Sequence, residues 1–285
     1  MLFLAVALVI LSAAVAAPTA HALLTRPPSG LLRPNFRGSQ IPVVGGHVLL
    51  AGVLAGEVGI AISYLVESGG HSVPVFLSRD HWGLLVLMLG FFGLGLTDDL
   101  AGAGHARGFR GHLKALASGE LTGGGIKALG GAALALVVAA LWEHQIGRAL
   151  VDAALICLAA NLVNLLDLRP GRATKVYLAG WVALAATAWD SAWVILTVPV
   201  ATAALLWGGP DLRERGMLGD AGANMLGAVL GGGVALTSGL RGRLVVLIVL
   251  AAVTLAAERW SLSAAINAVF PLRWLDQLGR ARSRP

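Results

Sequence analysis

Long apolar stretches separated by short polar segments fill almost the whole chain. The stretches are about 17 to 25 residues long, the length of an α-helix that crosses the hydrocarbon core of a membrane. Their spacing predicts an all-α, polytopic transmembrane bundle of about nine spans, with boundaries accurate to a few residues. The expected spans are 2–22, 46–66, 82–98, 124–142, 148–166, 175–189, 191–208, 217–238 and 243–258.

The first apolar stretch has two interpretations. Small residues near its end resemble a signal-peptide cleavage region: Ala16, Ala17, Ala20 and Ala22. However, no basic segment precedes the stretch, and it is longer than the apolar core of a usual signal peptide, about 7 to 15 residues. We therefore expect a retained first helix.

Composition agrees with a membrane protein. Only 13% of the 285 residues are charged and 57% are hydrophobic, whereas a soluble domain is about 25% charged. The net charge of +6 could indicate a nucleic-acid partner in a soluble protein. Here the basic residues lie in short loops, where they are better explained by orientation in the membrane, and we expect no nucleic-acid partner.

The distribution of Lys and Arg predicts the orientation of the chain. All but four of the 21 basic residues fall in alternate loops or in the tail; the exceptions are Arg79, Arg148, Arg241 and Arg243. Cytoplasmic loops carry the excess of Lys and Arg. We therefore expect the N-terminus outside the cell membrane and the C-terminus in the cytoplasm.

The chain after residue 258 differs from the transmembrane domain at 1–258. Apolar residues at 266–278 alternate with Arg273, Asp276, Gln277 and Arg280. This pattern predicts a short amphipathic helix in a cytoplasmic tail at 259–285. The helix could lie at the membrane interface or cap the bundle, and the sequence leaves both arrangements open.

Adjacent carboxylates end the third predicted span. Asp98 and Asp99 follow an apolar helix, where they repel each other unless a cation or proton intervenes. They also oppose the helix dipole at that end. Because Mg²⁺ prefers oxygen ligands, the pair predicts a metal site on the cytoplasmic side.

Two further polar groups lie at span ends on the same side. Asn161, Asn164 and Asp167 are three residues apart and share one helix edge, where they could bind a polar ligand or join helices. Asp220 opens the eighth span, where free backbone N–H groups would favour an anion. Three helix ends therefore bring acidic residues to one face.

Basic residues near these acids are candidates for phosphate contacts: Arg110, Lys114 and Lys127. A metal combined with Lys and Arg is the usual means of neutralising a phosphoryl group during transfer. Orientation in the membrane alone would also explain them. Glu57 and Asp152 lie within apolar stretches, and the sequence gives them no evident function.

Four segments in this order resemble the polyprenyl-phosphate N-acetylhexosamine-1-phosphate transferases, a superfamily that includes the phospho-N-acetylmuramoyl-pentapeptide transferases. The segments are Gln40–Gly46, Gly95–Asp99, Asn161–Asp167 and Gly219–Gly222 with Gly227. They are similar to the family's Pro–Gly–Gly, Asp–Asp, Asn-x-x-Asn-x-x-Asp and Gly-Asp-x-Gly motifs. The resemblance covers about residues 23 to 235.

The resemblance implies a Mg²⁺-dependent transfer of a sugar-1-phosphate from a UDP-sugar to a polyprenyl phosphate, with release of UMP. Asp220 would be the main Mg²⁺ ligand, Asp98 would assist the lipid phosphate, and Asp99 would support the metal or a phosphate. Asn164 and Asp167, with Asn161, would contact the nucleotide-sugar. The predicted partners are the two substrates and the membrane, with a second copy of the chain as a further candidate.

The chain departs from the family pattern after the third motif. Pro170 stands where a second acid is expected, no His follows His144, and a tenth span is missing. A non-catalytic relative that binds lipid phosphate or an envelope-assembly partner is therefore the alternative. A secondary transporter would show two related halves with polar groups at mid-membrane, whereas here the acids lie at one face.

Overall fold

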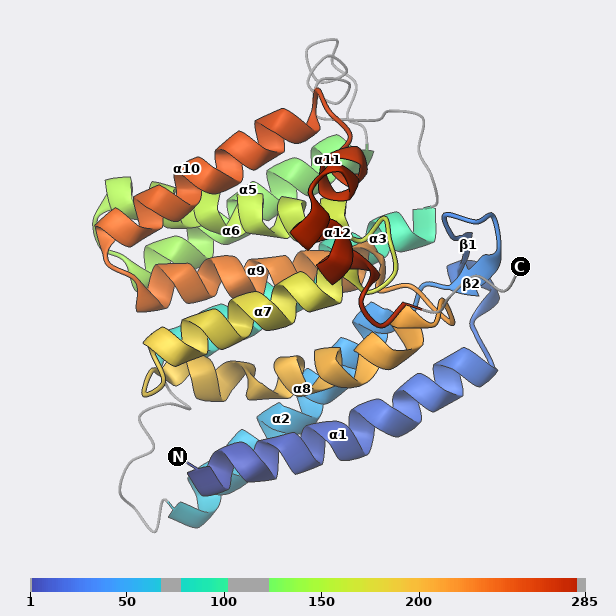
Figure 1. Ribbon diagram of the computed structural model, residues 1–285. Coiled ribbons are helices and arrows are strands. Elements are labelled where there is room, and N and C mark those ends of the chain that lie inside the picture. Colours follow the sequence, from blue (N-terminus) through green and yellow to red (C-terminus); the bar gives the residue numbers. More distant parts are fainter. Residues whose placement is uncertain (1, 68–77, 102–122, 281–285) are drawn as a thin grey trace.

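The computed structural model describes residues 2–67, 78–101 and 123–280, and an α-helix lies at each of the nine predicted ranges (Figure 1). The prediction of an all-α bundle is confirmed. The nine helices are α1 (Leu2–Thr25), α2 (Gly45–Glu67), α3 (Arg79–Ala101), α5 (Gly123–Trp142), α6 (Ile146–Leu166), α7 (Arg172–Thr187), α8 (Ala192–Leu212), α9 (Gly219–Thr237) and α10 (Leu240–Ala257).

Six of these helices are long and apolar enough to cross a membrane: α1, α2, α3, α6, α8 and α10. Large apolar side chains also cover their outer surfaces, and Phe3, Ile248 and Leu255 are 94%, 67% and 68% exposed. A helix that is apolar on its buried and exposed sides is typical of a membrane span. The shorter helix α7 has 16 residues, or about 24 Å, against a hydrocarbon core of about 30 Å.

Helix α9 is the centre of the bundle. It packs against α6 and α3, and also against α2 and α7. Most of its residues are buried, and its glycines allow close approach: a Cβ on Gly231 would lie 2.6 Å from the Cα of Ile156 in α6. The small residues of α9 therefore serve helix packing.

One end of the bundle carries a small hairpin and the tail. The short turn η1 (Ser29–Leu31) leads into strands β1 (Leu32–Pro34) and β2 (Gln40–Pro42), which pair antiparallel. The tail forms two short helices, α11 (Leu262–Ala268) and α12 (Phe270–Gln277), where the sequence predicted one amphipathic helix. The break falls at Val269, which is extended, and Pro271 lies in the first turn of α12, where a helix tolerates proline.

Charged pairs lie at or towards the other end of the bundle. Arg243 at the start of α10 donates to both carboxylate oxygens of the buried Asp152 in α6, at 3.1 and 2.8 Å. Glu57 in α2 contacts the buried His81 of α3 at 2.7 Å. Both acids left unexplained by the sequence therefore pair with a neighbouring helix, as buried charges within membrane proteins usually do.

The Asp152–Arg243 pair attaches α10, whose residues are all at least partly exposed. We expect Arg243→Ala to lower the free energy of unfolding by about 3 kcal/mol, because it leaves a buried carboxylate uncompensated. Arg241→Ala is the matched control; it removes an exposed Arg from the same turn and should change stability by less than about 0.5 kcal/mol. Thermal unfolding in detergent measures both, and equal effects would contradict the structural role of the pair.

Candidate active site

The four motif segments meet at the hairpin end of the bundle. Asp98 and Asp99 lie in the last turn of α3, Asp167 directly follows α6, and Asp220 lies in the first turn of α9. The Gln40–Gly46 segment forms β2 and the start of α2 and packs beside them. Residues separated by more than 100 positions along the chain therefore become neighbours.

Carboxylates from two other helices bind the backbone at the start of α9. Asp99 accepts hydrogen bonds from the N–H groups of Asp220 and Ala221, both at 3.0 Å, and Asp167 accepts one from Gly219 at 3.0 Å. The first N–H groups of a helix lack partners within the helix, and its positive end favours an anion. These N–H groups are occupied, so the expectation that they are free to hold a ligand anion is wrong.

The chain before α9 is fixed by the first motif. Met217 donates its N–H to Pro42 at 2.8 Å, and the N–H groups of Gly45 and Gly46 donate to the carbonyls of Met217 and Leu218 at 3.1 and 3.0 Å. Gly219 then adopts a φ of 78°, which favours glycine. The Pro–Gly–Gly segment therefore sets where α9 begins, and with it the position of Asp220.

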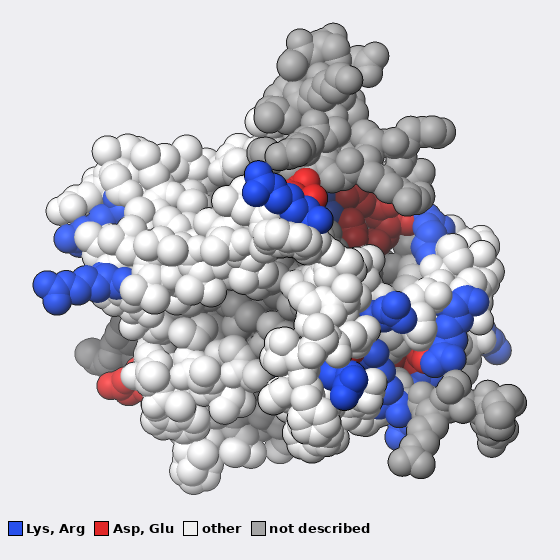
Figure 2. All heavy atoms as spheres, turned by 45° about the horizontal axis from the view of Figure 1, so that its top comes forward, with Lys and Arg blue, Asp and Glu red and all other residues white. Residues whose placement is uncertain are grey.

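Lys127 contacts Asp98 and Asp220, the two acids that do not bind the backbone at the start of α9. Its ammonium group lies 2.9 Å from Asp98 Oδ2 and 2.6 Å from Asp220 Oδ2. The side chains of Asp98 and Asp220 remain 29% and 35% exposed, so a ligand can reach them. On the side of the molecule seen in Figure 2, acidic side chains lie in a recess beside basic ones.

Arg33 of β1 binds the carbonyl groups at the C-terminal end of α3. Its guanidinium donates to the carbonyl of Asp99 and, at 3.4 Å, to that of Leu100. A cation at a helix C-terminus interacts favourably with the unpaired carbonyls there. The hairpin therefore helps α3 to end on two acids, an arrangement that the helix dipole alone disfavours.

Asp167 lies where acids accumulate. Burial raises the pKa of Asp167 well above its ordinary value, and the negative charges of Asp211, Asp220 and Asp99 act in the same direction, while the Gly219 N–H lowers it. Acids held this close favour a bound cation or proton. The raised pKa of Asp167 therefore reflects its burial first and the neighbouring acids second.

The other predicted ligand residues are less closely placed. Asn164 is half-buried and Asn161 is exposed on the last turns of α6, on the edge that leads to Asp167. Arg110 and Lys114 lie outside the described residues. The structure thus brings together Asp98, Asp99, Asp167, Asp220 and Lys127, while the predicted roles of Asn161 and Asn164 in substrate binding remain predictions.

The acids fit a magnesium ion that arrives with its own phosphate ligands. Among the described residues, His, Cys, Asp and Glu form no group of three or more that could hold a metal. Mg²⁺ commonly binds through one or two carboxylates, with water and substrate phosphate completing its octahedron. Asp98 and Asp220 direct two carboxylates at one positive charge, the Lys127 ammonium, which occupies the position of a shared cation.

The sequence did not predict the partners of two basic residues near this site. Both were expected only to orient the chain in the membrane, yet Arg33 binds the end of α3, and Arg172 binds Asp276 of the tail at 2.8 Å. The only sequence signal was that each lies within a few residues of a motif. Their partners are more than 60 positions away, so no local spacing could have indicated them.

Comparisons with family models and with curated proteins add no relative to this picture. No protein-family model matches the chain, and no curated protein matches it at a significant level. The residues of the site and their geometry therefore carry the evidence for its function.

Proposed function

We propose that this protein is a membrane-embedded transferase that moves a sugar-1-phosphate from a UDP-sugar to a polyprenyl phosphate. The observation that carries the proposal is the convergence of Asp98 and Asp220 on the Lys127 ammonium. Two carboxylates and a Lys at one point are the groups needed to hold a metal and neutralise transferring phosphates. The apolar outer surface of the helices supports a lipid acceptor, because such a substrate reaches the site through the membrane.

The reaction joins two phosphates. An oxygen of the lipid phosphate attacks the β-phosphorus of the UDP-sugar and forms the new P–O bond. The bond from that phosphorus to the bridging oxygen breaks, and UMP leaves with the electron pair. Bound Mg²⁺ would supply charge neutralisation on the phosphates.

The residues of the site would have different roles in this reaction. Asp98 and Asp220 would hold the metal, and Lys127 would transfer its ammonium contact to a substrate phosphate. Asp99 and Asp167 keep α9 in place through its N–H groups, so that Asp220 is held against Asp98. Asn164, half-buried one turn before Asp167, would contact the nucleotide-sugar together with it. Such preorganisation of charge commonly accounts for a large share of catalysis.

The proposal includes nine spans with the site on the cytoplasmic side of the cell membrane. Among the residues that the structure describes, all Lys and Arg except Arg79, Arg148, Arg241 and Arg243 lie at the site end of the bundle, as the positive-inside pattern expects. UDP-sugars are made in the cytoplasm, so a donor site facing that compartment is consistent with the chemistry.

We expect the purified protein in detergent, with Mg²⁺ and undecaprenyl phosphate, to release UMP from at least one member of a panel of UDP-sugars. The panel includes UDP-N-acetylglucosamine and UDP-N-acetylmuramoyl-pentapeptide, and chromatography detects UMP. Omission of the lipid or addition of EDTA should stop the release. Binding of undecaprenyl phosphate without UMP release from any donor would contradict the proposal and favour a non-catalytic relative.

A further inference from the structure

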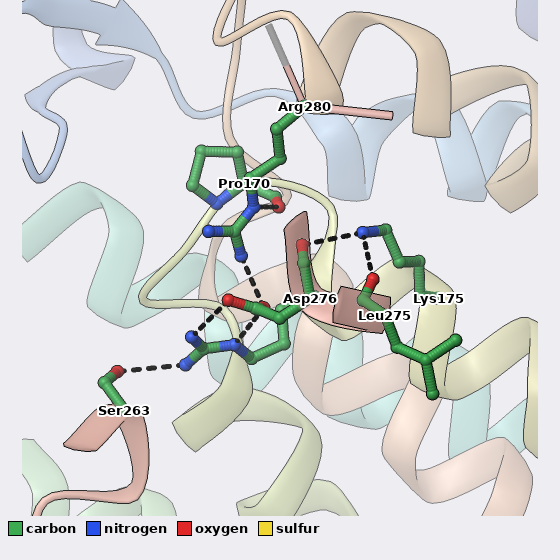
Figure 3. A network of polar contacts seen from close by, with 7 residues as sticks. Pro170, Lys175, Ser263, Leu275, Asp276 and Arg280 are labelled. Carbon is green, nitrogen blue, oxygen red and sulfur yellow. Dashed lines mark hydrogen bonds and ion pairs between the residues drawn. The ribbon is translucent and has the colours of Figure 1, made fainter. Parts of the chain in front are cut away.

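The tail helix α12 is attached to the bundle through one buried carboxylate. Asp276 accepts two hydrogen bonds from the guanidinium of Arg172, the first residue of α7, at 2.8 and 3.1 Å (Figure 3). The two side chains are 4% and 5% exposed. Arg172 also donates to Ser263 of α11 at 3.0 Å, so one side chain contacts both tail helices.

Two further basic residues complete the attachment. Lys175 donates to the carbonyls of Leu275 and Asp276, both at 2.9 Å, at the end of α12 (Figure 3). Arg280 donates to Asp276 at 2.5 Å and to the carbonyl of Pro170 at 3.0 Å. The tail therefore contacts the α6–α7 loop at Pro170, and it also binds Arg172, the residue at which the loop ends and α7 begins.

The network is charged, buried and specific in geometry. Burial alone would raise the pKa of Asp276, but the hydrogen bonds and charge of Arg172, together with Arg280, hold it below its ordinary value. Asp276 therefore stays ionised above that ordinary pKa, and its bonds persist at neutral pH. A bidentate Arg–carboxylate pair fixes both distance and orientation. By contrast, the apolar residues of α12, such as Phe270 and Trp274, remain 68% and 55% exposed.

The held loop leads directly into the candidate site. Pro170 lies three residues after Asp167, whose carboxylate binds the N–H of Gly219 at the start of α9. A continuous set of bonds thus runs from Asp276 through Arg172 and Arg280 to the loop, and from Asp167 to the residue before Asp220. Loosening the tail would release one side of this loop.

We propose that α12 is a clamp that fixes the α6–α7 loop, and that Asp276 is a positioning residue for Asp167. The role of Asp167 in donor binding rests on the proposed function, whereas the clamp itself is a statement about structure. Asp276 touches no substrate and acts only through Arg172, Arg280 and the loop.

The test replaces Asp276 by Asn in the full-length protein, which removes the charge at nearly constant volume. We expect hydrogen exchange in peptides covering 164–171 and 217–222 to become at least tenfold faster, while a peptide from the core of α2 keeps its wild-type rate. The matched control is Arg273→Gln, which removes an exposed charge from the same helix and should leave all three peptides unchanged. Asp276→Glu keeps the charge and should restore most of the protection.

Activity measurements give the second readout. With any donor that the wild type uses, we expect Asp276→Asn to raise the KM for the UDP-sugar about tenfold and to leave kcat within about threefold, because Asp98, Asp220 and Lys127 lie on other elements. A merely structural tail would lower the amount of active protein and hence the apparent kcat, with KM unchanged. Unchanged exchange and unchanged KM in folded Asp276→Asn would overturn the clamp.

A second variant tests the clamp in case Asp276→Asn does not fold. Arg280→Gln removes the Pro170 contact and one bond to Asp276 and leaves the Arg172 pair intact. We expect faster exchange in 164–171 only, and wild-type exchange there would overturn the clamp. If the wild type releases no UMP from any donor, the proposed function fails, yet the exchange experiments still decide the clamp.

Discussion

Asp220→Asn is expected to lower UMP release by at least about 100-fold, the usual loss when a preorganised charge at a reacting phosphate or oxyanion is removed. The substitution keeps the shape of the side chain and the backbone N–H that binds Asp99 at 3.0 Å. Within the described part of the chain, it leaves Asp98 as the only carboxylate on Lys127, so the pair can no longer hold a shared cation. Initial rates of UMP release, measured over a range of Mg²⁺ concentrations, report the effect.

Asp190→Asn is the matched control for this prediction. It makes the same chemical change at an exposed turn between α7 and α8, at the opposite end of the bundle. We expect wild-type rates from it, and a loss from Asp98→Asn similar to that of Asp220→Asn. A folded Asp220→Asn protein with more than a third of the wild-type rate would rule out Asp220 as the metal ligand.

Gly95→Ala is expected to destabilise the protein by about 3 kcal/mol, at the upper end of the usual cost of overpacking. A Cβ on Gly95 would lie 2.3 Å from the carbonyl oxygen of Asp220 and 2.4 Å from the N of Ala221. Both atoms belong to the backbone, so no rotamer change can relieve the contact. Helix α9 must move away from α3, which also separates Asp99 from the N–H groups it binds.

Gly93→Ala provides the comparison for Gly95→Ala. Gly93 lies in the same helix, and a Cβ there would meet no atom within 4 Å. Because Ala is the better helix former, this variant should be neutral or stabilised by up to about 1 kcal/mol. Thermal unfolding in detergent and UMP release should both separate the two variants, and equal behaviour would show that close contact between α3 and α9 is unimportant.

The candidate site uses its acids for two different purposes. Asp99 and Asp167 bind the N–H groups at the start of α9, whereas Asp98 and Asp220 bind Lys127. The first pair fixes a helix, and the second pair is available to a cation. Direct metal ligation by Asp99 remains a prediction, although its hydrogen bonds favour a positioning role.

The sequence by itself determined where the helices lie. Each predicted span contains a helix, because a run of about 20 apolar residues has few other ways to satisfy its backbone polar groups within a membrane. It also placed the ends at Asp98, Asp167 and Asp220 on a common side, because successive spans alternate in direction. Both properties depend on residues close together in the chain.

Only the tertiary structure decided which charges meet. The pairs Asp152–Arg243 and Arg172–Asp276 join residues about 90 and 100 positions apart. Whether two such side chains touch depends on how each helix is rotated about its axis and which neighbour it packs against. The length of an apolar stretch carries no information on either, so the different roles of the acids are decided only when the bundle is assembled.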